Sequence, residues 1–147
     1  MKQLQENESG TSVVELAVVL PMLAFLLIGL VEIGRYTYFG IVAAHAARAG
    51  VQYGGQTLVT ALDTTGMTTA ASKDAQSLSN WTVTPSHVCT SSGSVVSCPN
   101  GSGASIPGVV YYVQVQVKGT FATLMNYPGI PNNIPVTATA MMRIGNQ

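Results

Sequence analysis

Glu15 is the only charged residue in an apolar run of nineteen residues, Val13 to Val31. A carboxylate at hydrocarbon depth costs about 2.5–3.5 kcal/mol even on lenient insertion scales, so it needs a cation or a place near the membrane surface. A cut after Gly10 would create that cation, because the new α-amine of Thr11 has an ordinary pKa near 8. Thr11 and Glu15 share one helix face, and the amine of one subunit could equally neutralise Glu15 of a neighbour. If Glu15 is satisfied only by the Thr11 amine of a neighbouring chain, the pair would hold subunits in register.

The segment that carries Glu15 is predicted to be a membrane-spanning helix. Its nineteen residues would extend roughly 28 Å as a helix, close to the ~30 Å hydrocarbon core of a bilayer. Pro21 removes a backbone hydrogen bond and predicts a kink, either as a tolerated membrane proline or as a point of bending. A second, compatible role for Glu15 is local: Thr11 or Ser12 would cap the helix, with the carboxylate in its first turn.

Two sequence patterns surround this segment. The first is Gly10, four residues, and then Glu-Leu-Ala-Val-Val-Leu-Pro, which ends at Pro21. The second joins Gly-Leu-Val-Glu-Ile-Gly-Arg-Tyr, residues 29–36, to Ala-Ala-Arg-Ala-Gly-Val-Gln-Tyr-Gly, residues 46–54. Together they resemble the TadE-like pseudopilins of the tight-adherence (Flp/Tad) pilus system, within the type IV pilin-like superfamily. The resemblance is close over residues 10 to 55 and loose in the C-terminal third.

The resemblance implies a function and a location. A protein of this family would be cut after Gly10 by a prepilin peptidase and would cross the bacterial inner membrane once, with its C-terminal domain outside the cytoplasm. It would act with other pilin-like subunits and inner-membrane pilus assembly proteins, as a minor subunit that could enter the pilus. The alternative is an anchored extracytoplasmic binding domain that does not polymerise. Orientation depends on the resemblance, because Lys2 is balanced by Glu6 and Glu8 in the leader.

The helix is predicted to continue beyond the membrane and to end at Gly54 and Gly55. Glu32 and Arg35 are three residues apart, a spacing that predicts an exposed ion pair at the far membrane face. Aromatic residues typical of a membrane interface follow: Tyr36, Tyr38 and Phe39. Small residues then recur at spacings of three and four, forming a stripe: Gly40, Ala43, Ala44, Ala47 and Gly50. Such a stripe permits close approach of another element, and beyond Ala44 we favour the protein's own sheet over a second subunit.

The C-terminal residues are predicted to form a small antiparallel sheet. Residues 109–118 alternate, with Val113, Val115 and Val117 on one side and polar residues on the other, as in a half-buried strand. Residues 134–144 alternate in the same way, so the two strands should pair as neighbours. The expected fold is α+β and pilin-like, a long N-terminal transmembrane helix packed on this sheet. The predicted divisions are a leader (1–10), a transmembrane helix (11–31), its extramembrane continuation (32–55) and an extracytoplasmic domain (56–147).

Weaker patterns fill the remaining positions. Apolar spacing over 67–80 predicts a short amphipathic helix. Pro85 restricts residues 81–88 to an edge strand at best. Residues 121–127 are expected to form a turn of helix over the core, and loops are expected over 56–66, where a frayed helix is the alternative, and over 99–108 and 128–133.

Cys89 and Cys98 are predicted to form a disulfide, since eight intervening residues are ample for closure and an extracytoplasmic domain is in an oxidising environment. The rival is a metal site with His87, but two thiols and one imidazole fall short of the four ligands of a structural zinc site. His45 is expected to lie on a polar helix face.

Composition argues against other classes of function. Charged residues make up only 8% of the 147, against about 25% in typical soluble domains, and the net charge is zero. Neither nucleic-acid binding nor electrostatic steering is therefore indicated. The sequence also lacks a Walker loop, a Gly-x-Ser-x-Gly motif and a His-Glu-x-x-His motif. We expect no enzyme activity, cofactor, metal or small-molecule substrate; the expected partners are proteins and membrane lipid.

Overall fold

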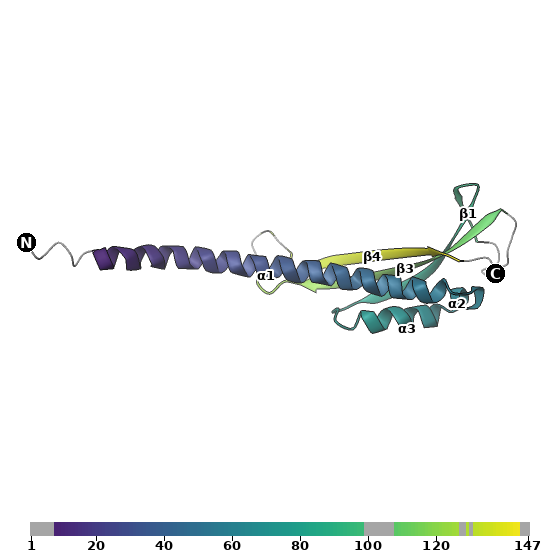
Figure 1. Ribbon diagram of the computed structural model, residues 1–147, viewed down its shortest axis with the longest axis horizontal. Helices are drawn as coiled ribbons and strands as arrows, with labels where there is room; N and C mark the ends of the chain where they lie inside the picture. Colours follow the sequence, from purple (N-terminus) through teal and green to yellow (C-terminus); the bar gives the residue numbers. More distant parts are fainter. Residues whose placement is uncertain (1–7, 99–107, 127–128, 130, 145–147) are drawn as a thin grey trace, which may run out of the picture. The chain divides into compact units, whose positions relative to one another are not determined.

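The computed structural model describes residues 8–98, 108–126, 129 and 131–144 (Figure 1). It divides into two compact units, Met1–Tyr36 and Thr37–Gln147. The fold is α+β, as predicted, with described strands that pair antiparallel in the order β2-β1-β3-β4. The elements are α1 (Glu8–Gly54), α2 (Leu58–Leu62), α3 (Thr64–Asp74), β1 (Thr82–Ser91), β2 (Ser94–Val96), β3 (Val109–Ala122) and β4 (Asn133–Arg143).

β3 lies inside the sheet, between β1 and the edge strand β4, and its pairing with β4 runs from Tyr112 opposite Arg143 to Ala122 opposite Asn133. The predicted strand at 109–118 and its pairing with the last strand are confirmed, and its three inward valines are fully buried. The predicted turn of helix at 121–127 is wrong over its described residues. Phe121 and Ala122 extend β3 instead, because Phe121 continues the inward alternation and packs on Phe39; Tyr127 lies outside the described residues.

β1 is an interior strand at one end and an edge strand at the other, because β2 pairs only with Cys89–Ser91. Ile144 N–H donates to the Tyr111 carbonyl over 2.9 Å, which identifies Tyr111 and alternate residues after it as those bonded to β4. The backbone N–H and C=O groups of Gln114 and Gln116 therefore point toward β1. Pro85 lies opposite Val115, so its nitrogen points away from β3 and its missing N–H removes no bond of the ladder. The prediction of an edge strand holds for this part of β1 only.

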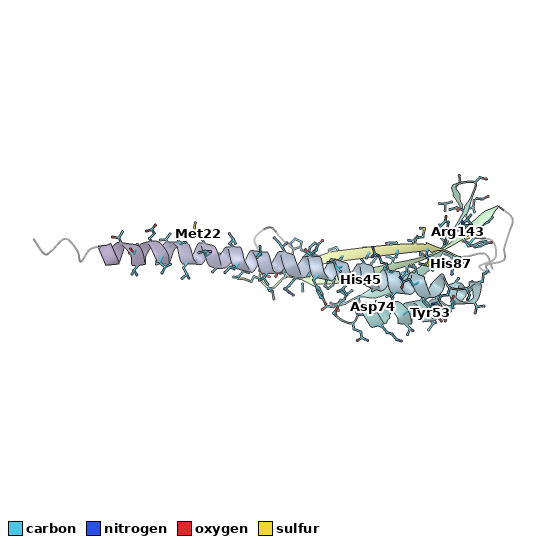
Figure 2. The ribbon with its side chains drawn as sticks, in the orientation of Figure 1. Met22, His45, Tyr53, Asp74, His87 and Arg143 are labelled. Atoms are coloured by element: carbon cyan, nitrogen blue, oxygen red, sulfur yellow. A yellow bond between two sulfur atoms is a disulfide. The ribbon has the colours of Figure 1, made fainter. Side chains whose placement is uncertain are left out.

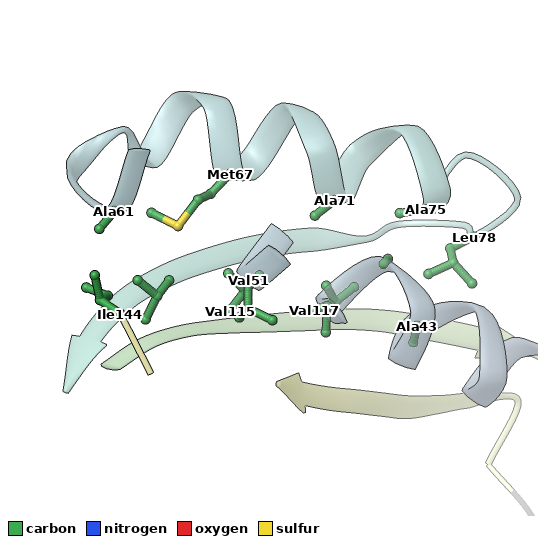
Figure 3. Packing of buried hydrophobic residues seen from close by; sticks show 13 residues of the cluster. Ala43, Val51, Ala61, Met67, Ala71, Ala75, Leu78, Val115, Val117 and Ile144 are labelled. Atoms are coloured by element: carbon green, nitrogen blue, oxygen red, sulfur yellow. The ribbon is translucent and has the colours of Figure 1, made fainter. Parts of the chain in front are cut away.

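The core lies between the sheet and the two helices α1 and α3 (Figure 3). Its fully buried members on these elements are small residues, one methionine and valines: Ala43, Ala46, Ala47, Met67, Ala71, Val113, Val115 and Val117. Gly50 sits so close to β3 that an added Cβ would lie 3.0 Å from Val115 Cγ1. This part of the small-residue stripe is therefore occupied by the protein's own sheet, while Gly40 and Ala44 are half-buried.

The segment after α1 differs from its prediction in position. The predicted helix at 67–80 is α3, which begins at Thr64 and ends at Asp74. It starts early because the Asp63 side chain accepts a hydrogen bond from Gly66 N–H, which caps the first turn. It ends early because residues 75–80 form turns, with Asn80 at a φ of 48°. α2 occupies part of the predicted loop and is capped by reciprocal bonds between Thr57 and Thr60.

The disulfide between Cys89 and Cys98 is present, with a Cα–Cα distance of 5.2 Å. It ties β1 to the chain just beyond β2. Ser92 and Gly93, with φ values of 50° and 83°, make the tight turn between these strands. The imidazole Nε2 of His87 faces the Ala61 carbonyl at 2.5 Å, so this side chain links β1 to α2. Within the described ranges, no three His, Cys, Asp or Glu side chains are placed to hold a metal ion.

Candidate functional site

The first half of α1 exposes apolar side chains on all its faces. Apart from the half-buried Ile28, the large apolar side chains from Val13 to Val31 have exposed fractions from 43% at Val19 to 72% at Met22, and Met22 projects outward from the helix in Figure 2. A helix on the surface of a soluble domain would instead bury an apolar stripe and expose a polar face. Among the described residues, one helix, Gly10–Gly54, is long and apolar enough to cross a membrane. Its length and composition fit a single-pass membrane anchor.

Glu15 lies on this exposed surface, within the helix rather than at its start. Because α1 begins at Glu8, Thr11 and Ser12 are interior residues, and the predicted cap at either of them is wrong for the uncut chain. In the helix, the amide of Ser12 lies one turn after the carbonyl of Glu8. A cut after Gly10 would change this, because Thr11 would become the first residue and its amine would lie about 6 Å along the axis from Glu15.

Neither Gly10 nor Pro21 interrupts helix α1. A Cβ added at Gly10 would meet no atom within 4 Å, apart from the helix's own nearby backbone. Packing therefore does not require glycine at this position. α1 continues through Pro21 without interruption (Figure 1), and the bend expected there stays a prediction.

The predicted ion pair is present: Arg35 Nη1 donates to Glu32 Oε2 over 3.1 Å. Tyr36 and Tyr38 are exposed to 44% and 62%. Phe39 differs from its expected role as an interface aromatic, because its ring packs edge-on against Phe121 with centroids 5.8 Å apart. Two of the three aromatic residues are therefore exposed, and the third, Phe39, packs within the C-terminal unit. His45 is exposed on α1, as expected (Figure 2).

One polar cluster was not anticipated from the sequence. Tyr53 Oη–H donates to Asp63 Oδ2, and Gly66 N–H donates to Asp63 Oδ1, both over 2.8 Å. The Gly66 amide and, after it, the Tyr53 hydroxyl lower the pKa of Asp63, and the same carboxylate raises the pKa of Tyr53. The cluster joins the end of α1 to the start of α3, so its role is structural. An aspartate directly before a helix is the signal that could have revealed the cap.

A family model described as TadE-like protein matches residues 10–52. Most of α1 is therefore similar to TadE-like proteins. The match begins at Gly10, the predicted cleavage residue, and ends two residues before the end of α1. It includes both sequence patterns almost completely, so the resemblance inferred from them is confirmed over this segment. No curated protein and no solved structure matches the chain.

Proposed function

We propose that this protein is a minor pilin-like subunit, a pseudopilin, for assembly of a tight-adherence pilus. The observation that carries the proposal is the TadE-like match starting at Gly10, five residues before the carboxylate of an exposed apolar helix. A prepilin peptidase cuts between Gly10 and Thr11. The first half of α1 lies in the inner membrane and then in the polymer, and the unit Thr37–Gln147 stands outside the cytoplasm. The role is structural rather than enzymatic.

The pairing of Glu15 with an amine gives this assembly its specificity. Lipid tails are as apolar as leucine, so burial alone does not favour contact between helices inside a membrane. A charge without a partner is costly there. When the amine of Thr11 on one subunit meets Glu15 on another, both charges are satisfied. Subunits that dock out of register leave both charges unpaired, so the pair selects one axial position.

Processing is tested by mass spectrometry of the mature protein from piliated cells. We expect Thr11 as the first residue. Gly10→Ala should leave the folded C-terminal unit unchanged, because the position is open, while uncut protein accumulates in the membrane. Gly40→Ala is the matched control, since its added Cβ also meets nothing within 4 Å. Intact Met1 in piliated cells would contradict the proposal.

Assembly is tested by Glu15→Ala, with Glu15→Gln separating charge from size. Both variants should insert in the membrane and be processed, yet should be absent from assembled pili or stop their assembly. Glu32→Ala is the control, because it removes a carboxylate from the same helix that already pairs with Arg35. If Glu15→Ala cells assemble normal pili that contain the variant, the protein is better described as an anchored binding domain.

A further inference from the structure

The connection between β3 and β4 exposes two adjacent apolar side chains. Leu124 is 60% and Met125 44% exposed. A hydrogen bond joins the two ends of this connection: Thr123 N–H donates to the Asn132 carbonyl over 3.0 Å. Two exposed apolar neighbours are not by themselves a contact surface, so the inference depends on where they lie.

Contacts along α1 show at which end of the C-terminal unit this connection lies. Gly54 approaches Val113, whereas Phe39 packs on Phe121, so β3 runs opposite to α1. The chain therefore leaves β3 at the end where α1 enters the unit, at Thr37. Leu124 lies only three residues beyond Phe121.

The chain itself limits how far this end can stand from the membrane. Val31 is the last residue of the apolar run, and Thr37 follows six positions later. Six residues extend about 9 Å as a helix and at most about 22 Å fully extended. The polar layer of a bilayer is about 5–7 Å thick on each side. Whatever the angle between the two units, the entry end of the C-terminal unit stays near the membrane surface.

The chemistry of the connection suits that surface. The sequence carries no charged residue from Gly119 to Met142, so no ionised side chain within this stretch opposes insertion. We propose that Leu124 and Met125 insert into the interface of the bilayer that holds α1, with lipid as their occupant. The inference rests on the membrane anchoring in the proposed function. It adds a second attachment that orients the C-terminal unit and is released when the subunit leaves the membrane.

Exposure alone does not carry the proposal, because Val59 and Val95 are exposed to 78% and 77%. These two lie toward the other end of the unit. Val95 pairs with Thr90, which lies opposite Val110 near the start of β3. Val59 is on α2, where Ala61 contacts His87, and His87 lies opposite Val113 in the first half of β3. Val59 and Val95 are therefore controls for exposure at a distance from the entry end.

The test places one tryptophan at a time in the full-length chain carrying Trp81→Phe. Leu124→Trp is compared with Leu23→Trp in the apolar helix and Val59→Trp at the far end, each reconstituted in phosphatidylcholine vesicles with brominated acyl chains. We expect quenching to be strongest for position 23, intermediate for position 124 and absent for position 59. Met125→Trp repeats the measurement, and an intact Cys89–Cys98 disulfide with unchanged circular dichroism verifies folding.

Different failures have different meanings. If position 23 is quenched and positions 124 and 125 match position 59, the interface contact is wrong while membrane anchoring stands. If position 23 is not quenched, the anchoring itself fails and the contact with it. If position 124 is shielded from aqueous acrylamide but not quenched by brominated lipid, a second protein chain covers the connection, and lipid is excluded as its occupant.

Discussion

Three glycines on α1 provide a graded test of how closely the sheet approaches the helix. An added Cβ at Gly40 would meet nothing within 4 Å. At Gly50 it would lie 3.0 Å from Val115 Cγ1, and at Gly54 it would lie 2.5 Å from Met67 Sδ and 2.9 Å from Val113 Cγ1. The same change, glycine to alanine, thus meets increasing steric opposition along one helix.

The expected magnitudes follow from two opposing effects. Alanine favours a helix over glycine by up to about 1 kcal/mol, so Gly40→Ala should raise the free energy of unfolding by roughly that amount. At Gly50 the gain is offset by a displacement of a few tenths of an ångström, and the net change should be near zero. At Gly54 overpacking costs about 1–3 kcal/mol. Met67 is fully buried there and cannot swing out to solvent, so Gly54→Ala should lower the stability.

The assay is chemical unfolding of the full-length protein in detergent, followed by Trp81 fluorescence. Trp81 is the chain's one tryptophan and packs against the core of the C-terminal unit, so its signal reports this unit. The stability order should be Gly40→Ala, then Gly50→Ala, then Gly54→Ala. Equal stability of the first and last variants would refute the close packing of α1 on β3 and α3.

Other expectations concern single contacts in the same unit. The lowered pKa of Asp63 means that its stabilising effect is present above its unfolded pKa near 3.9 and is lost as pH falls through the folded pKa; Asp63→Asn should abolish this dependence in acid titrations. Replacing Cys89 and Cys98 by alanine should cost about 2–3 kcal/mol in chemical unfolding, and reductant should then have no further effect. Phe39→Leu should lower the free energy of unfolding by about 0.5–1.5 kcal/mol, because the edge-on contact with Phe121 is lost. Tyr38→Leu, at an exposed position, should change it little in the same chemical unfolding measurement.

The fold could be predicted where local pattern and tertiary packing agree. The alternation of Val113, Val115 and Val117 reveals β3 because the same residues are buried in the structure. The prediction stopped at Lys118 because Gly119 interrupts the pattern. In the fold, the Phe39 ring approaches Gly119 so closely that an added Cβ would lie 3.1 Å from it. That contact joins residues eighty positions apart, so no local pattern contains it.

The displaced elements have similar causes. Thr64, Thr65 and Gly66 are weak helix formers, which moved the predicted start of α3 to Met67. The cap by Asp63 and the bond from Tyr53 offset that weakness, and Tyr53 lies on a different helix. Pro85 argued against an interior strand, but the proline occupies the stretch where β2 does not cover β1.

The candidate site was predictable for a different reason: its signal is compositional. A lone carboxylate among apolar residues, five positions after a glycine, needs no tertiary information to be noticed. The cap at Thr11 or Ser12 was misplaced because the sequence does not show that the helix begins before Gly10, at Glu8. What Glu15 contacts in an assembly depends on other chains, which the local pattern does not contain.

The TadE-like segment therefore combines two kinds of surface on one helix. From Val13 to Val31 its large apolar side chains, except the half-buried Ile28, are exposed, whereas at Ala43, Ala47 and Gly50 its small residues are buried against the protein's own sheet. A surface already covered by the sheet cannot also bind a neighbouring subunit. On the helix face that carries Ala43, Ala47 and Gly50, contacts between subunits of the proposed pilus must therefore involve residues N-terminal to Phe39. These residues belong to the half of α1 that carries Glu15. Substituting Ala43 or Ala47 by leucine should destabilise the C-terminal unit, because these residues pack against the sheet. Substituting Glu15 should disturb subunit registration and leave the stability of the C-terminal unit unchanged.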